Sequence, residues 1–167
     1  MSRDWGFSFR PPTEADMDAL AAGMRLADRR EVRRWTGQDL AFEVRHSVET
    51  SDVCHAAFFG DGALACLFGA CRANALEGEA VIWALTTEAV DRHRVEFWAG
   101  SKAGLDLLFR EMPDVSAFSN YVDAEYAASQ RWLWRLGATP ALAPRRRGFR
   151  GGEFVPFYFI NPHCTEV

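Results

Sequence analysis

The chain has 167 residues, of which 49% are hydrophobic, and its formal net charge is −4. We expect one domain spanning residues 1–167, and the 13 Phe and 6 Trp supply a sizeable core. The mild negative charge gives no general attraction to nucleic acid, which makes such a partner unlikely. No apolar run approaches the ~18 residues of a membrane-spanning helix, and the first residues lack the apolar stretch of a signal peptide. We therefore expect a cytoplasmic protein without a membrane segment.

The cysteines give no sign of a metal site. Cys54, Cys66, Cys71 and Cys164 form no C-x-x-C pair and repeat no spacing. Zinc ligands normally cluster in the chain, so we expect no bound metal. Buried, reduced thiols agree with a cytoplasmic location.

The first third of the chain reads as a strand followed by helices. The strand covers residues 7–10 and ends at two prolines, after which Thr13 has the spacing of a helix cap with Asp16. Residues 27–35 are densely charged, which predicts a solvated helix face. A third helix is expected from Asp39 to about Val48.

The pattern then changes to strands. Three are expected at 55–59, 63–73 and 79–86, with a Gly-Asp-Gly hairpin turn at 60–62. A long helix follows at 91–112, ended by Pro113, and its Gly100 and Gly104 favour close packing. The remaining predicted elements are a strand at 118–122, a helix capped by Gly137, a loop at 144–152 and a closing strand at 153–160.

This order of elements resembles the GNAT fold of CoA-dependent N-acetyltransferases over almost the whole chain. The segments RPPTEADMDAL near the start and RLGAT after the last helix carry the likeness. The resemblance implies an α/β (α+β) fold with a mixed central sheet flanked by helices. It also implies that the strand at 79–86 separates from the strand at 118–122 after residues 81–83, which opens a V-shaped cleft.

Within that fold the chain is similar to small internal virion or head-morphogenesis proteins of short-tailed bacteriophages. The similar features run from the Arg-Pro-rich start to the final aromatic strand. They are Trp83–Thr87, Arg92–Trp98, Tyr121-Val122, Leu136–Ala138 and Phe157–Phe159. These are hydrophobic and turn positions, not chemical signatures. The resemblance implies an accessory protein of a phage or prophage, cytoplasmic in the host bacterium or associated with the virion.

The chemistry of an acetyltransferase is only partly present. The resemblance places the CoA pyrophosphate loop at residues 87–95, which contain no glycine and carry Glu88 and Asp91 where an anion should bind. In many enzymes of this fold a Tyr acts as the general acid. The corresponding position here is Leu133, with Trp134 beside it, and neither side chain can act as a general acid. By the same resemblance, the candidate cofactor contacts are Thr86, Thr87, Arg92, Arg94 and Tyr126, and the candidate catalytic bases are Glu79 and Glu88.

Two functions remain open. One is a phage accessory protein on a GNAT scaffold with a degenerate acetyl-CoA site, which binds phage or host proteins or a second copy of itself. The other is a divergent N-acetyltransferase that uses acetyl-CoA. For the first, Trp and Arg are the residue types that most often anchor interfaces. The predicted interface residues are Trp132, Trp134, Arg135, Arg145, Arg146, Arg147 and Arg150.

Overall fold

The computed structural model describes residues 6–74 and 76–165. Its helices cover the two faces of a sheet and are α1 (Glu14–Gly23), α2 (Leu26–Trp35), α3 (Leu40–Glu49), the short 3₁₀ helix η1 (Glu88–Asp91), α4 (Arg94–Glu111) and α5 (Ala127–Leu136). Its strands are β1 (Ser8–Arg10), β2 (Val53–Phe58), β3 (Leu64–Asn74), β4 (Glu79–Thr86), β5 (Ala117–Asp123), β6 (Thr139–Pro140), β7 (Arg146–Arg147) and β8 (Glu153–Ile160).

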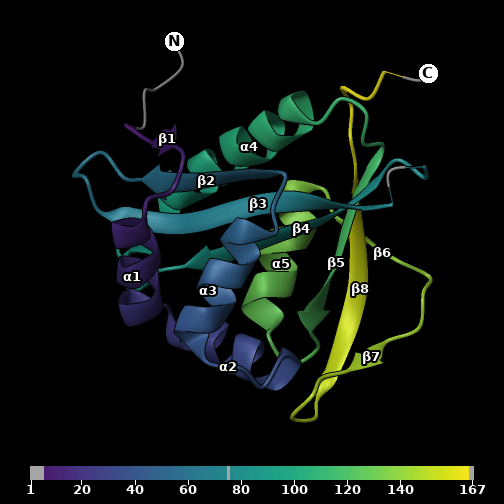
Figure 1. Cartoon of the computed structure of the whole chain (residues 1–167), viewed down its shortest axis with the longest axis horizontal. Helices are drawn as coiled ribbons and strands as arrows, with labels where there is room; N and C mark the ends of the chain where they lie inside the picture. The colour runs from purple at the N-terminus through teal and green to yellow at the C-terminus, as the bar shows by residue number, and fades with distance from the viewer. Residues whose placement is uncertain (1–5, 75, 166–167) are drawn as a thin grey trace.

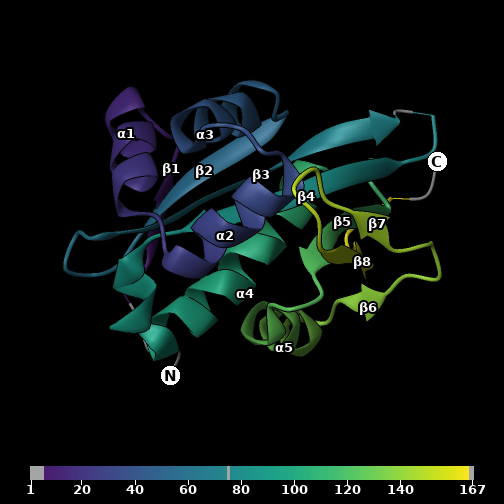
Figure 2. The ribbon, with the colours of Figure 1, turned by 90° about the horizontal axis from the view of Figure 1, so that it is seen from below.

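The sheet is mixed, and helices lie on both of its faces. The strand order is β1-β2-β3-β4-β5-β8-β6, and β7 pairs with β8. Helices α1, α2 and α3 lie on one side, whereas α4 and α5 lie on the other (Figures 1 and 2). Alternation along the strands explains the two layers. Ala56 and Leu67 pack with the α1 and α3 cluster, whereas Ala57 and Phe68 pack with the α4 cluster.

The two central strands run side by side for only part of their length. Strands β4 and β5 are parallel and pair at three positions, from Glu79 with Ala117 to Val81 with Ser119. Beyond this point β4 continues along β3, while β5 continues along β8. At the point of separation the Asn120 side-chain amide donates to the Ile82 carbonyl over 2.6 Å. The predicted V-shaped opening is confirmed.

Most predicted elements appear where the sequence placed them. Thr13 and Asp16 form the expected capping box, and Gly137 ends α5 with φ of 102°. The long helix begins later than predicted, at Arg94, because residues 88–91 form the separate turn η1. The segment after α5 also contains the short strands β6 and β7, which the sequence did not predict.

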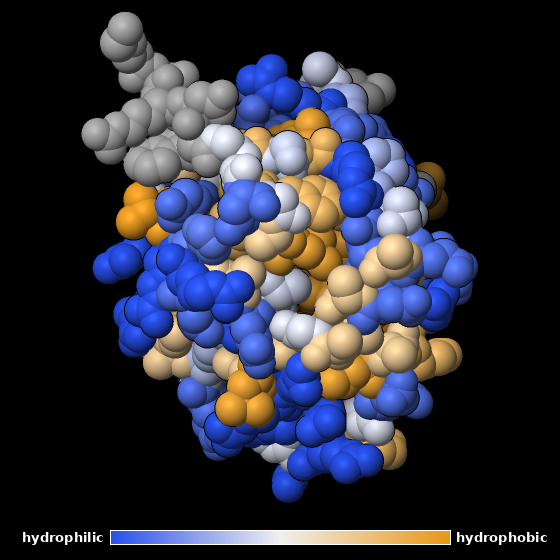
Figure 3. Space-filling model, turned by 90° about the vertical axis from the view of Figure 1, so that its left-hand side faces the viewer, coloured by the Kyte–Doolittle hydropathy of each residue, from blue (hydrophilic) through white to orange (hydrophobic). Residues whose placement is uncertain are grey.

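Two glycines of α4 have no side chain that would keep the helix away from the sheet, so the helix packs closely there. A Cβ atom on Gly100 would lie 2.5 Å from the ring of Phe7, and one on Gly104 would lie 3.1 Å from Phe68. The predicted packing role of both glycines is therefore confirmed. The face seen from the left-hand side of Figure 1 carries an apolar hollow that is bordered mainly by polar residues (Figure 3). Within residues 6–74 and 76–165, no helix combines the length and apolar character needed to cross a bilayer.

A buried asparagine after β8 fixes the end of α4. The Asn161 side-chain amide donates to the carbonyls of Phe109, Met112 and Val115 over 2.8–3.1 Å. These carbonyls belong to the last turn of α4 and the loop after it, where backbone acceptors lack helical partners. One side chain therefore ties the helix, the loop and the last strand together.

We expect Asn161→Ala to lower the free energy of unfolding by about 1–3 kcal/mol, because the Phe109 and Val115 carbonyls lose the amide donor while the Met112 carbonyl keeps the Val115 N–H. Urea denaturation followed by circular dichroism measures this change. The matched control is Gln38→Ala on the surface, which should shift the free energy by less than about 0.5 kcal/mol. Equal effects of the two substitutions would contradict the role assigned to Asn161.

Candidate functional site

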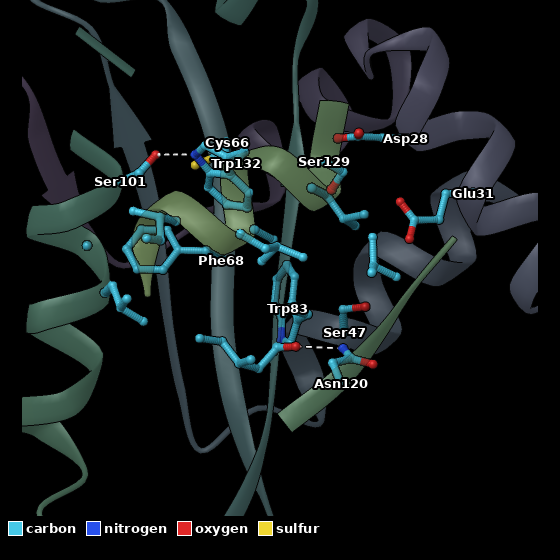
Figure 4. A pocket seen from close by; sticks show the side chains of 18 of the residues that line it. Asp28, Glu31, Ser47, Cys66, Phe68, Trp83, Ser101, Asn120, Ser129 and Trp132 are labelled. Carbon is cyan, nitrogen blue, oxygen red and sulfur yellow. Dashed lines mark hydrogen bonds between the residues drawn. The ribbon is translucent and has the colours of Figure 1, made fainter. Parts of the chain in front are cut away.

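The separation of β4 and β5 contains a cavity of about 310 Å³. Its walls come from both layers of helices and from the sheet between them. Figure 4 shows ten of the lining residues, which are Asp28, Glu31, Ser47, Cys66, Phe68, Trp83, Ser101, Asn120, Ser129 and Trp132. The walls are mainly apolar, and a few polar groups face the interior, as is typical of ligand sites.

Helix α2 supplies one wall of this cavity, which corrects the prediction of a solvated charged segment. Asp28, Glu31, Val32 and Trp35 line the cavity at helical spacing. The arginines between them point elsewhere: Arg29 donates to the carbonyls of Met24 and Ala22. The many charged residues of this segment belong to an amphipathic helix, and its inner face carries two carboxylates and an indole.

Asp28 joins the separated ends of the two strands. One of its carboxylate oxygens, Oδ2, accepts from the backbone N–H and the hydroxyl of Thr86, at the end of β4, over 2.7 and 2.6 Å. The other accepts from the hydroxyl of Tyr126, just before α5, over 3.3 Å. Arg25 donates to the same Tyr126 oxygen over 3.1 Å. Asp28 therefore has partners on both oxygens and links the end of β4 to the segment that follows β5.

Glu31 lies one turn further along α2 and has fewer partners. Its Oε1 accepts from the backbone N–H of Asp123, at the end of β5, over 3.0 Å. No ion pair joins it to a cation within the described residues. Burial raises its pKa to about 7; the carboxylates of Asp28 and Asp123 add to the rise, while the Asp123 N–H and Arg34 oppose it. Glu31 is thus a carboxylate that titrates near neutrality beside the cavity (Figure 4).

The C-terminal end of α2 is held by the arginine-rich loop. Arg34 bonds to Asp123 over 2.7 Å and to Glu125 over 2.8 Å. The backbone N–H groups of Phe149 and Arg150 donate to the carbonyls of Trp35 and Arg34. Loop 144–152 is therefore fixed against the helix and closes the gap between α2 and β8.

The predicted interface residues divide into two groups. Trp132 and Trp134 are both half-buried and pack against the core. The Trp132 indole turns toward α4, where it donates to the Ser101 hydroxyl over 3.2 Å (Figure 4). The arginines are exposed on α5 and on loop 144–152. They are Arg135, Arg145, Arg146, Arg147 and Arg150.

Among these arginines, two have defined partners. Arg145 forms an ion pair with Glu153 over 2.9 Å, and Arg146 lies 4.8 Å from the centre of the Tyr121 ring. The loop thus carries a fixed basic surface, and the structure places the two indoles away from it, at the cavity and the core.

The candidate cofactor residues at the end of β4 already use their donors. Thr86 bonds to Asp28, and the Thr87 hydroxyl donates to the Leu64 carbonyl over 2.6 Å. The Thr87 N–H donates to the Ala65 carbonyl over 2.9 Å. Both residues therefore hold the end of β4 in place and offer no free donor to a ligand.

The other candidates do not form a common site. Arg92 and Arg94 are exposed at the start of α4, and Arg94 lies 3.8 Å from Asp91. Glu88 is exposed on η1, and Glu79 is exposed at the opposite end of β4, where that strand still pairs with β5. Neither predicted base lines the cavity between the strands. Tyr126 lies after the end of β5, and its hydroxyl is bonded to Asp28.

The loop after β4 has few free N–H groups of its own for the pyrophosphate of CoA, although helix α4 begins without a side-chain cap. A pyrophosphate site needs several free backbone N–H groups. Here the N–H groups of Val90, Arg92 and His93 donate to carbonyls within the loop, and that of Ala89 donates to Thr87. The Thr86–Asp28–Tyr126 bridge also spans the opening between the strand ends.

The sequence contains a signal for the buried face of α2, which the prediction of a solvated helix face did not use. Residues spaced three, four and seven apart along α2 alternate with arginines, and these residues are Asp28, Glu31, Val32 and Trp35. An apolar and acidic stripe within a basic segment indicates a buried face. In the described part of the chain, no three His, Cys, Asp or Glu side chains gather as metal ligands do.

Comparison with solved structures gives the fold a name. A single-residue variant of the spermidine N-acetyltransferase of Vibrio cholerae superposes with a TM-score of 0.69 at 11% identity, covering 93% of this chain and 94% of that one. The same enzyme in complex with CoA and spermine gives 0.66 at 12% identity, covering 93% and 96%. The ribosomal-protein-S18-alanine N-acetyltransferase of Escherichia coli gives 0.64 at 15% identity, covering 96% of each chain. No family model and no curated protein matches the sequence. At these identities the likeness is one of fold, and the chain has the fold of the GNAT acetyltransferases.

We expect Glu31→Gln to stabilise the chain more at pH 8 than at pH 5. The folded-state pKa of about 7 lies above the usual value of 4.5, so the folded chain binds the extra proton between those values. Stability from this group therefore falls as pH rises from about 4.5 through 7, by roughly 2 kcal/mol. Glutamine keeps the acceptor for the Asp123 N–H and removes the charge.

Urea denaturation of both chains at pH 5, 6, 7 and 8 measures this difference. The exposed Glu49→Gln on α3 serves as the control and should show no such trend. A stability difference between Glu31→Gln and the unmodified chain that stays constant with pH would refute the assignment.

Proposed function

We propose that this chain is a binding protein on a GNAT scaffold and that it does not transfer acetyl groups from CoA. The observation that carries the proposal is the bridge from Thr86 through Asp28 to Tyr126. It joins the end of β4 to the segment between β5 and α5, across the gap between the two strands. The loop after β4 supports the proposal because the N–H groups of Ala89, Val90, Arg92 and His93 are used internally, although α4 begins without a side-chain cap.

The wider role that we propose is that of an accessory protein in phage or prophage particle assembly. This role rests on the sequence resemblance to internal virion and head-morphogenesis proteins. The fixed loop 144–152 supplies the surface for a protein partner or a second copy of the chain. Light scattering of the unmodified chain and of an Arg147→Glu, Arg150→Glu double variant tests whether this surface joins two copies.

A second candidate is an N-acetyltransferase, and Glu31 is the observation that favours it. A carboxylate with a pKa of about 7 beside a cavity is suited to accept a proton from an amine. In that role Glu31 would replace the predicted bases Glu79 and Glu88. On α5, the position that corresponds to the general-acid Tyr of these enzymes is the buried Leu133, which cannot donate a proton.

We expect acetyl-CoA to bind the unmodified chain with a Kd weaker than about 1 mM, because the opening is bridged and the loop offers few donors. Isothermal titration calorimetry measures this. Tyr126→Phe removes the hydroxyl that bonds Asp28, and Tyr158→Phe on β8 is a matched control away from the bridge.

Binding in the micromolar range by the unmodified chain would overturn the proposal and favour the acetyltransferase. Binding gained only by Tyr126→Phe would support it, since the bridge would then be what excludes the cofactor.

A further inference from the structure

Helices α1, α2 and α3 cover only part of their side of the sheet. Of the helices that the structure describes, none lies over the hairpin ends of β3 and β4 or over the second half of β8 (Figures 1 and 2). The uncovered area, which we call the open face, includes one row of paired residues across four strands. This row is Cys71, Val81, Ser119 and Tyr158.

The open face carries apolar side chains that water reaches. Ala80 and Phe159 are buried in the core on the α5 side of the sheet, so alternation turns their chain neighbours Val81 and Ile160 to the open face. Val81 is 37% exposed and Ile160 is 64% exposed, and the half-buried Tyr158 lies beside them. Apolar side chains that gather on one exposed surface are typical of a protein contact site.

A charged residue stands at each end of the open face. Glu79 is exposed at the hairpin end, two residues before Val81 and on the same side of β4. At the other end, the Arg146 guanidinium lies 4.8 Å from the centre of the Tyr121 ring, which itself stacks on Trp35 of α2. Among the described residues, neither Glu79 nor Arg146 has an ion-pair partner, so each charge is available to a second molecule.

These two charges are too far apart to pair within one chain. The ladders place Glu79 level with Ile160 through Ala117, and they place Arg146 level with Phe154. The interval along β8 from 154 to 160 is six residues, which corresponds to about 20 Å of extended strand. One end of the open face is therefore negative, the other is positive, and the middle is apolar.

Such a face is complementary to a second copy of itself. A two-fold axis in the plane between two stacked faces, crossing the strands midway between the charges, exchanges the two ends. It places Glu79 of each copy against Arg146 of the other, and the apolar middles meet. Tyr158 lies close to the midpoint, so its ring lies near the same ring of the second copy.

We propose that the open face binds a second copy of this chain in a two-fold dimer, with Glu79 of each copy paired to Arg146 of the other. This inference rests on the binding role proposed above and names the partner and the surface. The face is about 20 Å long and about 20 Å wide across four or five strands, which suits a reversible dimer of folded chains.

Charge reversal tests the pairing, with the dimer constant measured by sedimentation equilibrium over a range of chain concentrations. Glu79→Arg and Arg146→Glu each bring like charges together at both symmetric contacts, so each should weaken the dimer by at least about 10-fold. The matched controls are Glu49→Arg on α3 and Arg131→Glu on α5. They make the same changes in net charge on exposed helix positions and should leave the dimer unchanged.

Mixing the two weakened variants gives the sharper result. In a heterodimer of Glu79→Arg with Arg146→Glu, both contacts again join opposite charges, so the equimolar mixture should dimerise as the unmodified chain does. The chain that carries both substitutions should recover as well. Circular dichroism confirms that each variant is folded, and this recovery shows that both single variants keep a competent surface.

The apolar middle has its own test. Tyr158→Lys places two like charges near the axis and should weaken the dimer by at least about 10-fold, whereas Tyr158→Phe should preserve it. This pair keeps the inference decisive if a variant at either end does not fold.

Four results would overturn the inference. They are a monomer at concentrations up to about 1 mM, a dimer insensitive to Glu79→Arg and Tyr158→Lys, no recovery on mixing, and a dimer lost only with Arg147→Glu and Arg150→Glu. The last would assign the contact to the outer side of loop 144–152. Micromolar binding of acetyl-CoA would overturn the proposed function and leave the dimer in place, so the two failures are distinguishable.

Discussion

The structure depends on the way helix α2 holds together two strands that diverge. Past Val81 the strands β4 and β5 are no longer paired through their backbones, so the sheet itself cannot fix their ends. Helix α2 supplies the missing contacts: Asp28 bonds to Thr86 on one side, and Glu31 and Arg34 bond to Asp123 on the other. The cavity exists because these contacts hold its walls apart at a fixed distance.

The two carboxylates of α2 show how similar groups acquire different roles. Asp28 is buried, and burial raises its pKa, although the bonds from Thr86 and the nearby Arg25 act in the opposite direction. A buried carboxylate is tolerable when its oxygens are bonded, so Asp28 is structural. Glu31 has one bonded oxygen and no ion pair within the described residues, so it keeps free capacity for a ligand.

Much of the fold could be predicted from the sequence, because its signals are local. The bounds of the strands at 79–86 and 153–160 follow from apolar runs between turn residues. The helix caps at Thr13 and Gly137 follow from the side chain or backbone conformation that each single position requires. The separation of the strands was predicted from the resemblance. The site was harder to predict, because its residues are far apart in the sequence. Thr86 lies 58 residues and Tyr126 lies 98 residues after Asp28, and the three meet only in the folded chain. The arginine-rich sequence of α2 also concealed which of its faces is buried.

The lining of the cavity has a consequence for how the protein absorbs and emits light. Of the six tryptophans, Trp35, Trp83 and Trp132 place their indoles at the cavity wall. The Trp83 indole donates to the Ser51 hydroxyl and the Trp132 indole to that of Ser101, so both rings are held in fixed surroundings. Indole emission shifts with the polarity around the ring. The tryptophan emission of this chain should therefore depend on whether water or an apolar group occupies the space between its two central strands.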